Sequence, residues 1–367
     1  MPSILDLFSG CGGLSLGAHK AGFSTALAVD SDRILSSSFS MNFPNTKISH
    51  ADVRSIHASA LTLLLPKGID GVVGGPPCQA FSEIGRRDAK DPRRTLVLEF
   101  FRIVAVANPK FFLFENVRGL GFEKNLHLLE DGLQLLGPKW KIIGPRVLNA
   151  ADFGAATKRR RLFVFGFDSD EMDPPIESNL CRKASAMVSV RDAIYDLAGA
   201  KEIRIDESGF DFWKYDRRRT VSEYALSMRS RSGLFTGHRT TAHTDNTVAR
   251  FSGLKSGQSD KVGKYVRLGW DGLCPTLRAG TGNDRGSYQA IRPIHPDENR
   301  VITPREAARL QGFPDDFLFH PTVWHSCRMI GNSVSPIIAE KLLRRIARHL
   351  PTMTNAHVPH SRRLARG

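Results

Sequence analysis

The sequence predicts an α/β fold in which a mixed, mostly parallel β-sheet carries helices on both faces, followed by a smaller, irregular domain. Over the first 168 residues, short apolar runs with strand character alternate with segments of helical periodicity. A glycine-rich turn lies directly after the first apolar run. From about residue 170 to residue 300 the apolar periodicity weakens, and Ser, Thr, Gly and Arg become frequent. The length of 367 residues suits two domains.

The first predicted unit is strand, turn and helix. Residues 4–8 are apolar, residues 9–13 (SGCGG) supply the turn, and the helical pattern that follows ends at Gly22. The spacing of the glycines differs from GxGxxG, and no Lys-Ser/Thr pair follows them. Taken alone, the turn indicates a tight structural bend as much as a ligand-binding loop.

Two acidic residues stand at the ends of the next two predicted strands. Residues 25–29 end in Asp30, and the short segment 47–51 ends in Asp52. A carboxylate at the end of the second strand binds ribose hydroxyls in nucleotide-binding folds, and Asp52 is placed to accept a hydrogen bond from an adenine amino group. Each acid alone is more typical of a cap or a turn. Together with the glycine turn they indicate a nucleoside pocket. Because no phosphate-binding lysine follows the glycines, S-adenosylmethionine fits best.

The segment from Gly74 to Ser82 (GGPPCQAFS) displays a cysteine on a stiff turn. It follows apolar residues 69–73, which we expect to end a buried strand. Two glycines let the backbone approach a flat group closely, and two prolines stiffen the exit. Cys78 is therefore expected to act as a nucleophile or as a metal ligand. Because no pair of the five cysteines has CxxC spacing, we predict no metal, and the odd count argues against disulfides.

The remaining elements complete the first domain. Strands are predicted at residues 111–117 and 161–167, and helices at about 95–107 and 126–136. A last helix, which begins at Pro336, is expected to pack back onto the first domain. The predicted parts of the chain are a cofactor-binding domain over residues 1–168, an irregular domain over 169–300, a return segment over 301–350 and a basic, disordered tail over 351–367.

The charge of the chain is strongly positive. Lys and Arg number 52 against 37 Asp and Glu, which gives a formal net charge of +15. The positive charges gather in short runs, such as residues 158–161 and 217–219, and this favours a polyanionic partner, with nucleic acid as the first candidate. No apolar run has the length of a membrane span, and no apolar signal segment precedes Ile4. We therefore expect a cytoplasmic protein with reduced thiols and no membrane contact.

Six motifs, in order along the chain, resemble those of the DNA (cytosine-5) methyltransferases, and the resemblance covers most of the sequence. The motifs are Asp6–Gly17 for the cofactor loop, Gly74–Ser82 for the catalytic loop, Glu115–Val117 for the acid, Lys158–Arg161 for the basic motif, Pro304–Pro314 for the segment that orders the recognition domain, and Gly331–Ser335 for the return to the cofactor. The resemblance implies a Rossmann-like, S-adenosylmethionine-dependent methyltransferase fold. It also implies a target-recognition domain over residues 169–300, S-adenosylhomocysteine as product, and double-stranded DNA as partner.

Two positions depart from the family pattern. The family commonly has Gln-x-Arg-x-Arg where this chain has Thr157 in place of the glutamine. Arg159 and Arg161 occupy the two arginine positions, and the contact that the glutamine makes in the family is left without an assigned residue. An aromatic residue often follows the ribose-binding acid, and here that position is Ser31. The adenine is therefore expected to stack elsewhere, with Phe8 as the candidate.

The resemblance implies a role for each residue of the site. The Cys78 thiolate attacks carbon 6 of a cytosine. Glu115 hydrogen-bonds ring nitrogen 3 and the exocyclic amine, and Arg161 with Arg159 holds the oxygen at position 2. The implied cofactor-binding residues are Phe8, Ser9, Gly10, Gly12, Gly13, Leu14, Asp30, Asp52, Val53, Pro77, Leu96, Asn332, Ser333 and Val334. The implied DNA-binding residues are Gln79, Ser82, Arg86, Arg87, Thr276 and Arg278.

The target cytosine must be flipped out of the helix, because attack on carbon 6 comes from above the ring face. We expect a monomer of the prokaryotic restriction-modification or orphan type, associated with the nucleoid through DNA, with any cognate restriction endonuclease acting separately. Two alternatives stay open: an RNA cytosine-5 methyltransferase and an inactive DNA-binding homologue. The basic middle segment favours duplex DNA over RNA. The joint retention of Cys78, Glu115, Asp30 and Arg161 favours an active enzyme.

Overall fold

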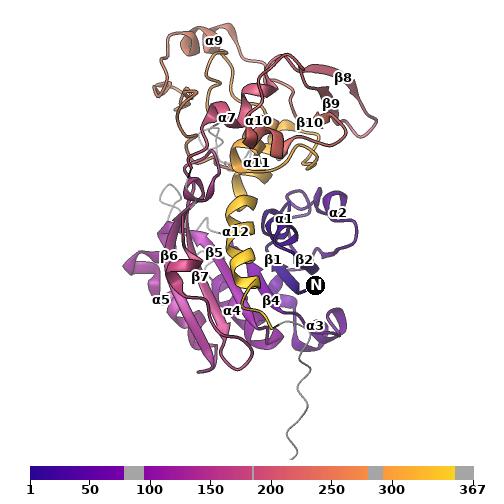
Figure 1. Ribbon diagram of the computed structural model, residues 1–367, viewed down its shortest axis with the longest axis vertical. Helices are drawn as coiled ribbons and strands as arrows, with labels where there is room; N and C mark the ends of the chain where they lie inside the picture. The colour runs from indigo at the N-terminus through magenta and orange to yellow at the C-terminus, as the bar shows by residue number, and fades with distance from the viewer. Residues whose placement is uncertain (78–94, 184–185, 280–291, 352–367) are drawn as a thin grey trace, which may run out of the picture.

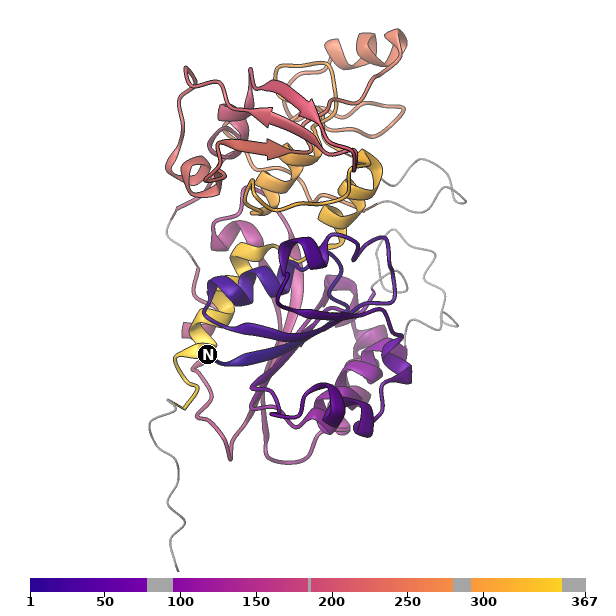
Figure 2. The ribbon, with the colours of Figure 1, turned by 90° about the vertical axis from the view of Figure 1, so that its right-hand side faces the viewer.

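The computed structural model describes residues 1–77, 95–183, 186–279 and 292–351 and shows two bodies, one above the other (Figure 1). The lower body is a twisted sheet with helices on both faces, and the upper body holds short strands and helices from the second half of the chain. We refer to them as the sheet body and the upper body. Figure 2 shows that the last helix, α12 (Pro336–Ala347), descends from the upper body beside α1 (Gly13–Lys20).

The sheet body confirms the predicted mixed, mostly parallel sheet. Within the described residues its strand order is β3-β2-β1-β4-β5-β7-β6. The first five strands in this order run parallel, while β7 is antiparallel to both of its neighbours. The strands are β1 (Ser3–Leu7), β2 (Ser24–Val29), β3 (Lys47–Ser49), β4 (Gly71–Gly74), β5 (Phe111–Val117), β6 (Trp140–Asn149) and β7 (Arg160–Asp168).

Alternating side chains divide the core of the sheet body into two layers. Ile4 packs in the layer under α1 and α12, whereas the next residue, Leu5, packs in the layer under α4 (Leu96–Ala107) and α5 (Glu123–Gln134). Phe111 and Phe112 of β5 divide between the layers in the same way. Because both faces are covered, the strands read as continuous apolar runs in the sequence. The helices of this body are α1, α2 (Phe39–Asn42), α3 (Ala58–Leu64), α4 (Leu96–Ala107), α5 (Glu123–Gln134), α6 (Glu177–Leu180) and α12.

A close helix pair joins the two ends of the chain. Pro336 occupies the first turn of α12, where its missing N–H costs no helical hydrogen bond. A side chain at Gly17 of α1 would place its Cβ 2.4 Å from the Cβ of Ala339, so only glycine permits the two helices to approach this closely. The carboxyl-terminal segment thereby becomes part of the layer that covers the sheet.

The upper body contains regular structure that the sequence did not predict. Three short antiparallel strands lie in the order β10-β9-β8. Every residue of β8 is exposed, so this strand lacks the apolar alternation by which strands are recognised in a sequence. The elements of this body are β8 (Lys201–Ile205), β9 (Asp211–Lys214), β10 (Leu234–Thr236), α7 (Val190–Ile194), α8 (Glu223–Met228), α9 (Asp245–Ser252), α10 (Pro304–Gln311) and α11 (Val323–Asn332).

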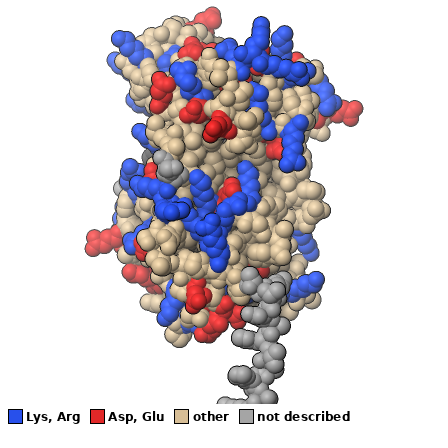
Figure 3. All heavy atoms as spheres, viewed as in Figure 1, with Lys and Arg blue, Asp and Glu red and all other residues tan. Residues whose placement is uncertain are grey.

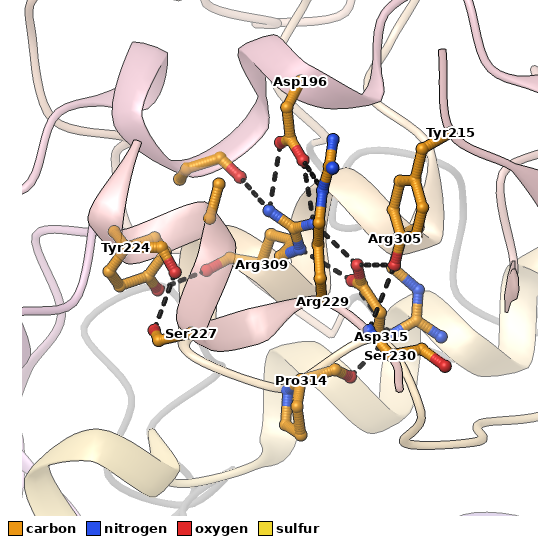
Figure 4. A network of polar contacts seen from close by, with 12 residues as sticks. Asp196, Tyr215, Tyr224, Ser227, Arg229, Ser230, Arg305, Arg309, Pro314 and Asp315 are labelled. Atoms are coloured by element: carbon orange, nitrogen blue, oxygen red, sulfur yellow. Dashed lines mark hydrogen bonds and ion pairs between the residues drawn. The ribbon is translucent and has the colours of Figure 1, made fainter. Parts of the chain in front are cut away.

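Helix α10 is buried along its whole length although its sequence is polar. Its amino end carries a capping box, in which the hydroxyl of Thr303 accepts from the N–H of Glu306 and the Glu306 carboxylate accepts from the N–H of Thr303. The guanidinium of Arg309 lies between Asp196 and Asp315 (Figure 4). The predicted return segment 301–350 therefore belongs to both bodies: α10 packs within the upper body, and α12 packs on the sheet.

One strand of the sheet body was missed. β6 contains Gly144 and Pro145, and the pairing of β6 with β7 shifts register between Ile143 and Arg146. Proline disfavours a central strand but is tolerated at an edge, and β6 is an edge strand.

The described helices are all too short or too polar to span a membrane.

Candidate active site

Three strand ends bring the predicted cofactor residues together. The N–H of Ser9 donates to the carbonyl of Val29 at 3.1 Å, and the N–H of Asp30 donates to the carbonyl of Ser49 at 3.1 Å. These bonds join the carboxyl ends of β1, β2 and β3 side by side. Parallel strands that end at one edge leave a crevice there, which is the usual ligand site of an open α/β sheet.

Asp30 closes the glycine turn from the second strand. Its carboxylate accepts from the N–H of Gly10 at 2.7 Å and from the N–H of Asp32 at 2.8 Å. Burial raises the pKa of the Asp30 carboxyl, and the two hydrogen bonds act in the opposite direction. Phe8 and Gly10 adopt positive φ values of 58° and 52°, a strained conformation for phenylalanine. Strain at this turn is typical of a ligand-binding loop.

The hydroxyl of Ser9 is a buried polar group without a hydrogen-bond partner among the described residues. A buried hydroxyl normally has a partner, since leaving it unpaired costs about 1–3 kcal/mol. Its position in the glycine turn suits a polar ligand group. The donor and acceptor set of Ser9, Gly10 and Asp30 therefore fits the ribose and amino acid portions of S-adenosylmethionine.

An apolar surface lies next to these polar groups. Phe8, Val53 and Leu96 belong to one hydrophobic cluster although they come from three distant segments. Such a surface fits the flat face of an adenine. Asp52 caps the turn that follows β3, and its carboxylate also binds the guanidinium of Arg54. The hydrogen bonds from Arg54 lower the pKa of the Asp52 carboxyl, so that it remains an ionised acceptor.

The segment from Asn332 to Val334 lies against the glycine turn. A Cβ at Gly13 would stand 2.0 Å from Oγ of Ser333 and 2.4 Å from the carbonyl oxygen of Val334. The absence of a side chain at Gly13 is thus a condition for this contact. Asn332 is exposed, whereas Val334 is buried. Leu14, the residue after Gly13, is buried in the layer under α12.

A buried acid lies beneath the glycine turn. Asp6 of β1 is fully buried and accepts from the hydroxyl of Ser15 in α1 at 2.6 Å. Thr25 of β2 donates to the same Ser15 oxygen at 3.2 Å. This contact joins the first strand, the first helix and the second strand directly beneath the turn. Burial raises the pKa of the Asp6 carboxyl to about 7.

The substitution Asp6→Asn is expected to flatten the dependence of stability on pH. Because the native pKa is raised above the ordinary value of 3.8, the native chain binds more protons than the unfolded chain between these values. The free energy of unfolding therefore falls as the pH rises from about 4 to 7, by about 1.4 kcal/mol per pKa unit at most. Urea unfolding at pH 5 and pH 8 measures this change. The exposed substitution Asp131→Asn is the control, and equal pH differences in all three proteins would refute the prediction.

The predicted acid lies beside the start of the predicted catalytic loop. A Cβ at Gly75 would stand 2.8 Å from Oε2 of Glu115, so the loop begins in contact with the carboxyl group. The side-chain amide of Asn116 donates to the carbonyl of Pro76 at 3.2 Å and fixes the direction of the chain. Asn116 had no predicted role of its own. Its position directly after the acid was the only available signal.

Glu115 and Arg161 form an ion pair from adjacent antiparallel strands. The distance from Nε of Arg161 to Oε1 of Glu115 is 3.2 Å. Strand register explains the contact, because Glu115 is opposite Phe163 and Arg161 is its diagonal neighbour. The pKa of the Glu115 carboxyl is raised by burial, while the positive charges of Arg161 and Arg159 act against that rise. A carboxyl with a raised pKa is suited to hold and donate a proton.

Arg159 connects this site to the rest of the molecule. Its guanidinium is buried and donates to the carbonyls of Leu277, at 3.2 Å, and Gly331, at 2.9 Å. The structure thus places Arg159 close enough to influence Glu115 electrostatically, with hydrogen bonds to backbone carbonyls. Arg159 was assigned by resemblance to the cytosine oxygen. Among the described residues, the ion-pair partner of Glu115 is Arg161.

The segment around Thr157 joins the two bodies. Thr157 pairs with Cys274 as an isolated parallel bridge, and its hydroxyl donates to the Cys274 carbonyl at 3.2 Å. Thr276, a predicted DNA contact, donates to the carbonyl of Lys158 at 2.5 Å. Thr157, which departs from the family pattern, therefore helps to connect the two bodies. Arg278, another predicted DNA contact, is exposed just beyond this connection.

The predicted nucleophile lies outside the described residues, as do four predicted DNA contacts, Gln79, Ser82, Arg86 and Arg87. Pro77, the residue before Cys78, is described and exposed. In all four described thiols burial raises the pKa, so none of them is poised to form a thiolate at neutral pH. These thiols are Cys11, Cys181, Cys274 and Cys327. Within the described ranges, no group of three or more His, Cys, Asp or Glu side chains is placed to hold a metal ion.

Sequence comparison gives a family match over nearly the whole chain. A family model described as C-5 cytosine-specific DNA methylase matches residues 3–348. The chain is 38% identical over 361 residues to the type II methyltransferase M.XorII of Xanthomonas oryzae pv. oryzae, which covers 92% of this chain and 82% of that protein. It is 33% identical to the type II methyltransferase M.DdeI of Desulfomicrobium norvegicum, with coverage of 94% and 88%.

Solved structures share the same architecture. A prophage-encoded E. coli chain, described as a candidate DNA modification methyltransferase, superimposes with a TM-score of 0.81 at 35% identity and covers 95% of this chain and 99% of its own. A mutant DNMT2 from Spodoptera frugiperda superimposes with a TM-score of 0.61 at 16% identity, over 95% of this chain and all of its own. The second likeness shows the fold alone.

Proposed function

Because the chain belongs to the C-5 cytosine-specific DNA methylase family, we propose that it transfers a methyl group from S-adenosylmethionine to carbon 5 of a cytosine in a specific duplex DNA sequence. One observation carries the proposal. Glu115, with a raised pKa, is paired with Arg161 at the point where the loop that begins at Gly75 leaves the sheet. An acid, an anion-stabilising cation and the entrance of the nucleophile loop are thereby assembled at one place.

The cofactor would be held by the three strand ends. Asp30 and the turn around Gly10 would bind the ribose, while Phe8, Val53 and Leu96 would enclose the adenine. Bound S-adenosylmethionine supplies an electrophilic methyl group. The residues of the chain would orient this methyl group. The contact between Ser333 and Gly13 would close the pocket on the side opposite the strand ends.

The chain's own residues would activate the cytosine. Carbon 5 is a weak nucleophile until the Cys78 thiolate adds to carbon 6, which makes the ring electron-rich at carbon 5. The protonated Glu115 carboxyl would donate to ring nitrogen 3 as negative charge develops there, and Arg161 would stabilise the oxygen at position 2. After the transfer, loss of the carbon-5 proton allows Cys78 to leave. The raised pKa values of the described thiols support Cys78 as the nucleophile, since none of the others is activated.

The substitution Glu115→Gln is expected to lower kcat by about a hundredfold, while cofactor affinity stays nearly unchanged. Glutamine keeps the shape of the side chain but has no proton to transfer to ring nitrogen 3. Single-turnover methyl transfer from tritiated cofactor and calorimetric cofactor binding give the two values. The exposed substitution Glu130→Gln serves as the control. A wild-type rate in the Glu115→Gln protein would remove Glu115 from the mechanism.

We propose that residues 1–168, together with α12, form the catalytic domain and that residues 169–300, with α10 and α11, recognise the target. A duplex bound between them would present one cytosine, flipped from the stack at a cost of a few kcal/mol. The similarity to type II methyltransferases supports a restriction-modification setting, in which a separate cognate endonuclease would cleave the same sequence pattern where it is unmethylated. A monomer suffices for this arrangement, because both bodies come from one chain.

Expression in a host without cytosine methylation, followed by bisulfite sequencing, tests the proposal. A single sequence pattern with 5-methylcytosine at a fixed position is the expected result, and it also identifies the target. Methylated RNA beside unmethylated DNA would instead support an RNA cytosine-5 methyltransferase. A purified protein that binds duplex DNA but methylates neither nucleic acid would contradict the proposal and indicate an inactive homologue.

A further inference from the structure

A stripe of basic side chains lies across the face of the sheet body that α12 covers (Figure 3). Four of its members recur on α12 and just beyond it with the spacing i, i+3, i+4 and i+7, so that they share one face of the helix. Two more come from the segment after α6. We call these six residues the basic stripe: Arg182, Lys183, Lys341, Arg344, Arg345 and Arg348.

The charges of the basic stripe are only partly neutralised. Among the described residues, Glu340 pairs with Arg344 at 2.6 Å and Asp152 pairs with Lys183 at 3.1 Å. Within the described part of the chain, six positive charges thus face two acidic partners. The pKa of Arg345 is lowered by burial, and the positive charges of Arg182 and Arg348 lower it further. Like charges are therefore held close together, an arrangement that favours an anionic partner.

Backbone contacts hold the stripe in position. Arg344 donates to the carbonyl of Lys20 at 2.5 Å, and Arg345 donates to the carbonyl of Leu180 at 2.7 Å. The Arg345 guanidinium also lies 5.5 Å from the ring centre of Phe153. These contacts order the long side chains without cancelling their charge. An ordered cation loses less conformational entropy when it binds a phosphate than a freely moving one does.

The part of the stripe around Arg344 lies away from the proposed active site. Lys20 ends α1, and the chain then enters β2 at its amino end, so Arg344 stands near the amino edge of the sheet. Glu115 and Gly75 lie at the opposite, carboxyl edge. The six residues of β2 alone separate the two edges by about 20 Å. A duplex that delivers a cytosine to Glu115 therefore does not account for the stripe.

We propose that the basic stripe binds the phosphate backbone of a second segment of duplex DNA. From Lys341 to Arg348 the helix rises about 10 Å, and duplex DNA carries one negative charge per about 1.7 Å of its axis. Four of the six cations are arginines, whose planar guanidinium matches a phosphate with two hydrogen bonds. The inference rests on the proposed function in one respect: DNA is the polyanion that the active site already brings near. A protein that holds two segments can move between them without full release.

A bridging assay tests the proposal. One duplex is fixed to beads, the full-length protein is added at limiting amount, and capture of a second, fluorescent duplex is measured. The double variant R182E/R348E removes two exposed cations of the stripe. Its matched control, K67E/K124E, makes the same change of net charge at exposed positions elsewhere on the sheet body. We expect the wild type and the control to capture the second duplex, and the stripe variant to capture at least about tenfold less, as expected from lost phosphate contacts.

The outcomes separate this proposal from the proposed function. Methylation of a single short duplex reports on the active site alone and is expected to be unchanged in R182E/R348E. Equal capture by all three proteins would overturn the proposal, as would an equal loss of short-duplex methylation and of bridging, which would assign the stripe to the substrate duplex. Binding of phosphatidylglycerol vesicles in place of DNA would also overturn it. Sedimentation of the free proteins completes the test, because bridging that follows self-association would assign the stripe to an interface between copies.

Discussion

Replacement of Cys78 by alanine is expected to abolish both methyl transfer and covalent capture of DNA that carries 5-fluorocytosine at the target position. In the proposed mechanism the thiolate adds to carbon 6, and the adduct breaks down only when a proton leaves carbon 5. Fluorine at carbon 5 cannot leave as a proton, so the adduct persists. Without the thiol no adduct forms, and the rate falls by at least about a thousandfold, as is usual when a covalent nucleophile is removed.

Denaturing gel electrophoresis of protein and labelled DNA measures the adduct, with the target sequence taken from the bisulfite map. The control is Cys181→Ala, which removes a half-buried thiol whose pKa is raised by burial. That variant is expected to form the adduct at the wild-type rate. An adduct that persists in the Cys78→Ala protein would show that another group attacks the ring.

The substitution Arg309→Ala is expected to destabilise the upper body by about 3–5 kcal/mol, because it removes one partner from a buried ion network. The Arg309 guanidinium is completely buried, donates to Asp315 at 2.6 and 2.7 Å, and donates to Asp196 at 3.1 Å. Tyr215 and Arg229 add further bonds to the same two carboxylates (Figure 4). Alanine would leave two buried acids without their main counter-charge.

Thermal unfolding followed by circular dichroism measures this loss. The matched control is Arg218→Ala, which removes an exposed arginine that pairs with Asp216 at 3.0 Å. Solvent and salt screen an exposed pair, so the control is expected to unfold close to the wild-type temperature. The Arg309→Ala protein is expected to unfold about 10 °C lower. Similar unfolding temperatures for both variants would show that the network does not hold the upper body together.

One buried arginine connects the sheet body with the upper body. Arg159, which directly precedes β7 of the sheet body, donates to the carbonyls of Leu277 and Gly331 in the upper body, and its charge also acts on Glu115. A change at this residue would therefore alter the pKa of the acid and the placement of the upper body together. Substitution of Arg161 is the cleaner probe of the chemistry, since its ion pair with Glu115 lies within the sheet.

Local sequence signals determined the elements around the cofactor. The apolar runs that end in Phe8, Asp30 and Gly74 predicted three strands, and the structure places these strands in adjacent positions of one sheet. These predictions succeeded because local interactions determine such structures. A buried strand, a glycine turn and a first-turn proline such as Pro336 depend on neighbours within a few residues.

Only the tertiary structure decided the rest. The sequence of α10 is that of a solvated helix, yet Arg305 and Arg309 are buried because carboxylates and carbonyls from distant segments surround them. The edge position of β6 permits a proline that argues against a strand. Residue types and motif order thus predicted the chemistry, through Glu115 and Arg161. Their pairing, and the placement of Asp6 beneath the cofactor loop, follow from strand register and long-range packing, which no local pattern encodes.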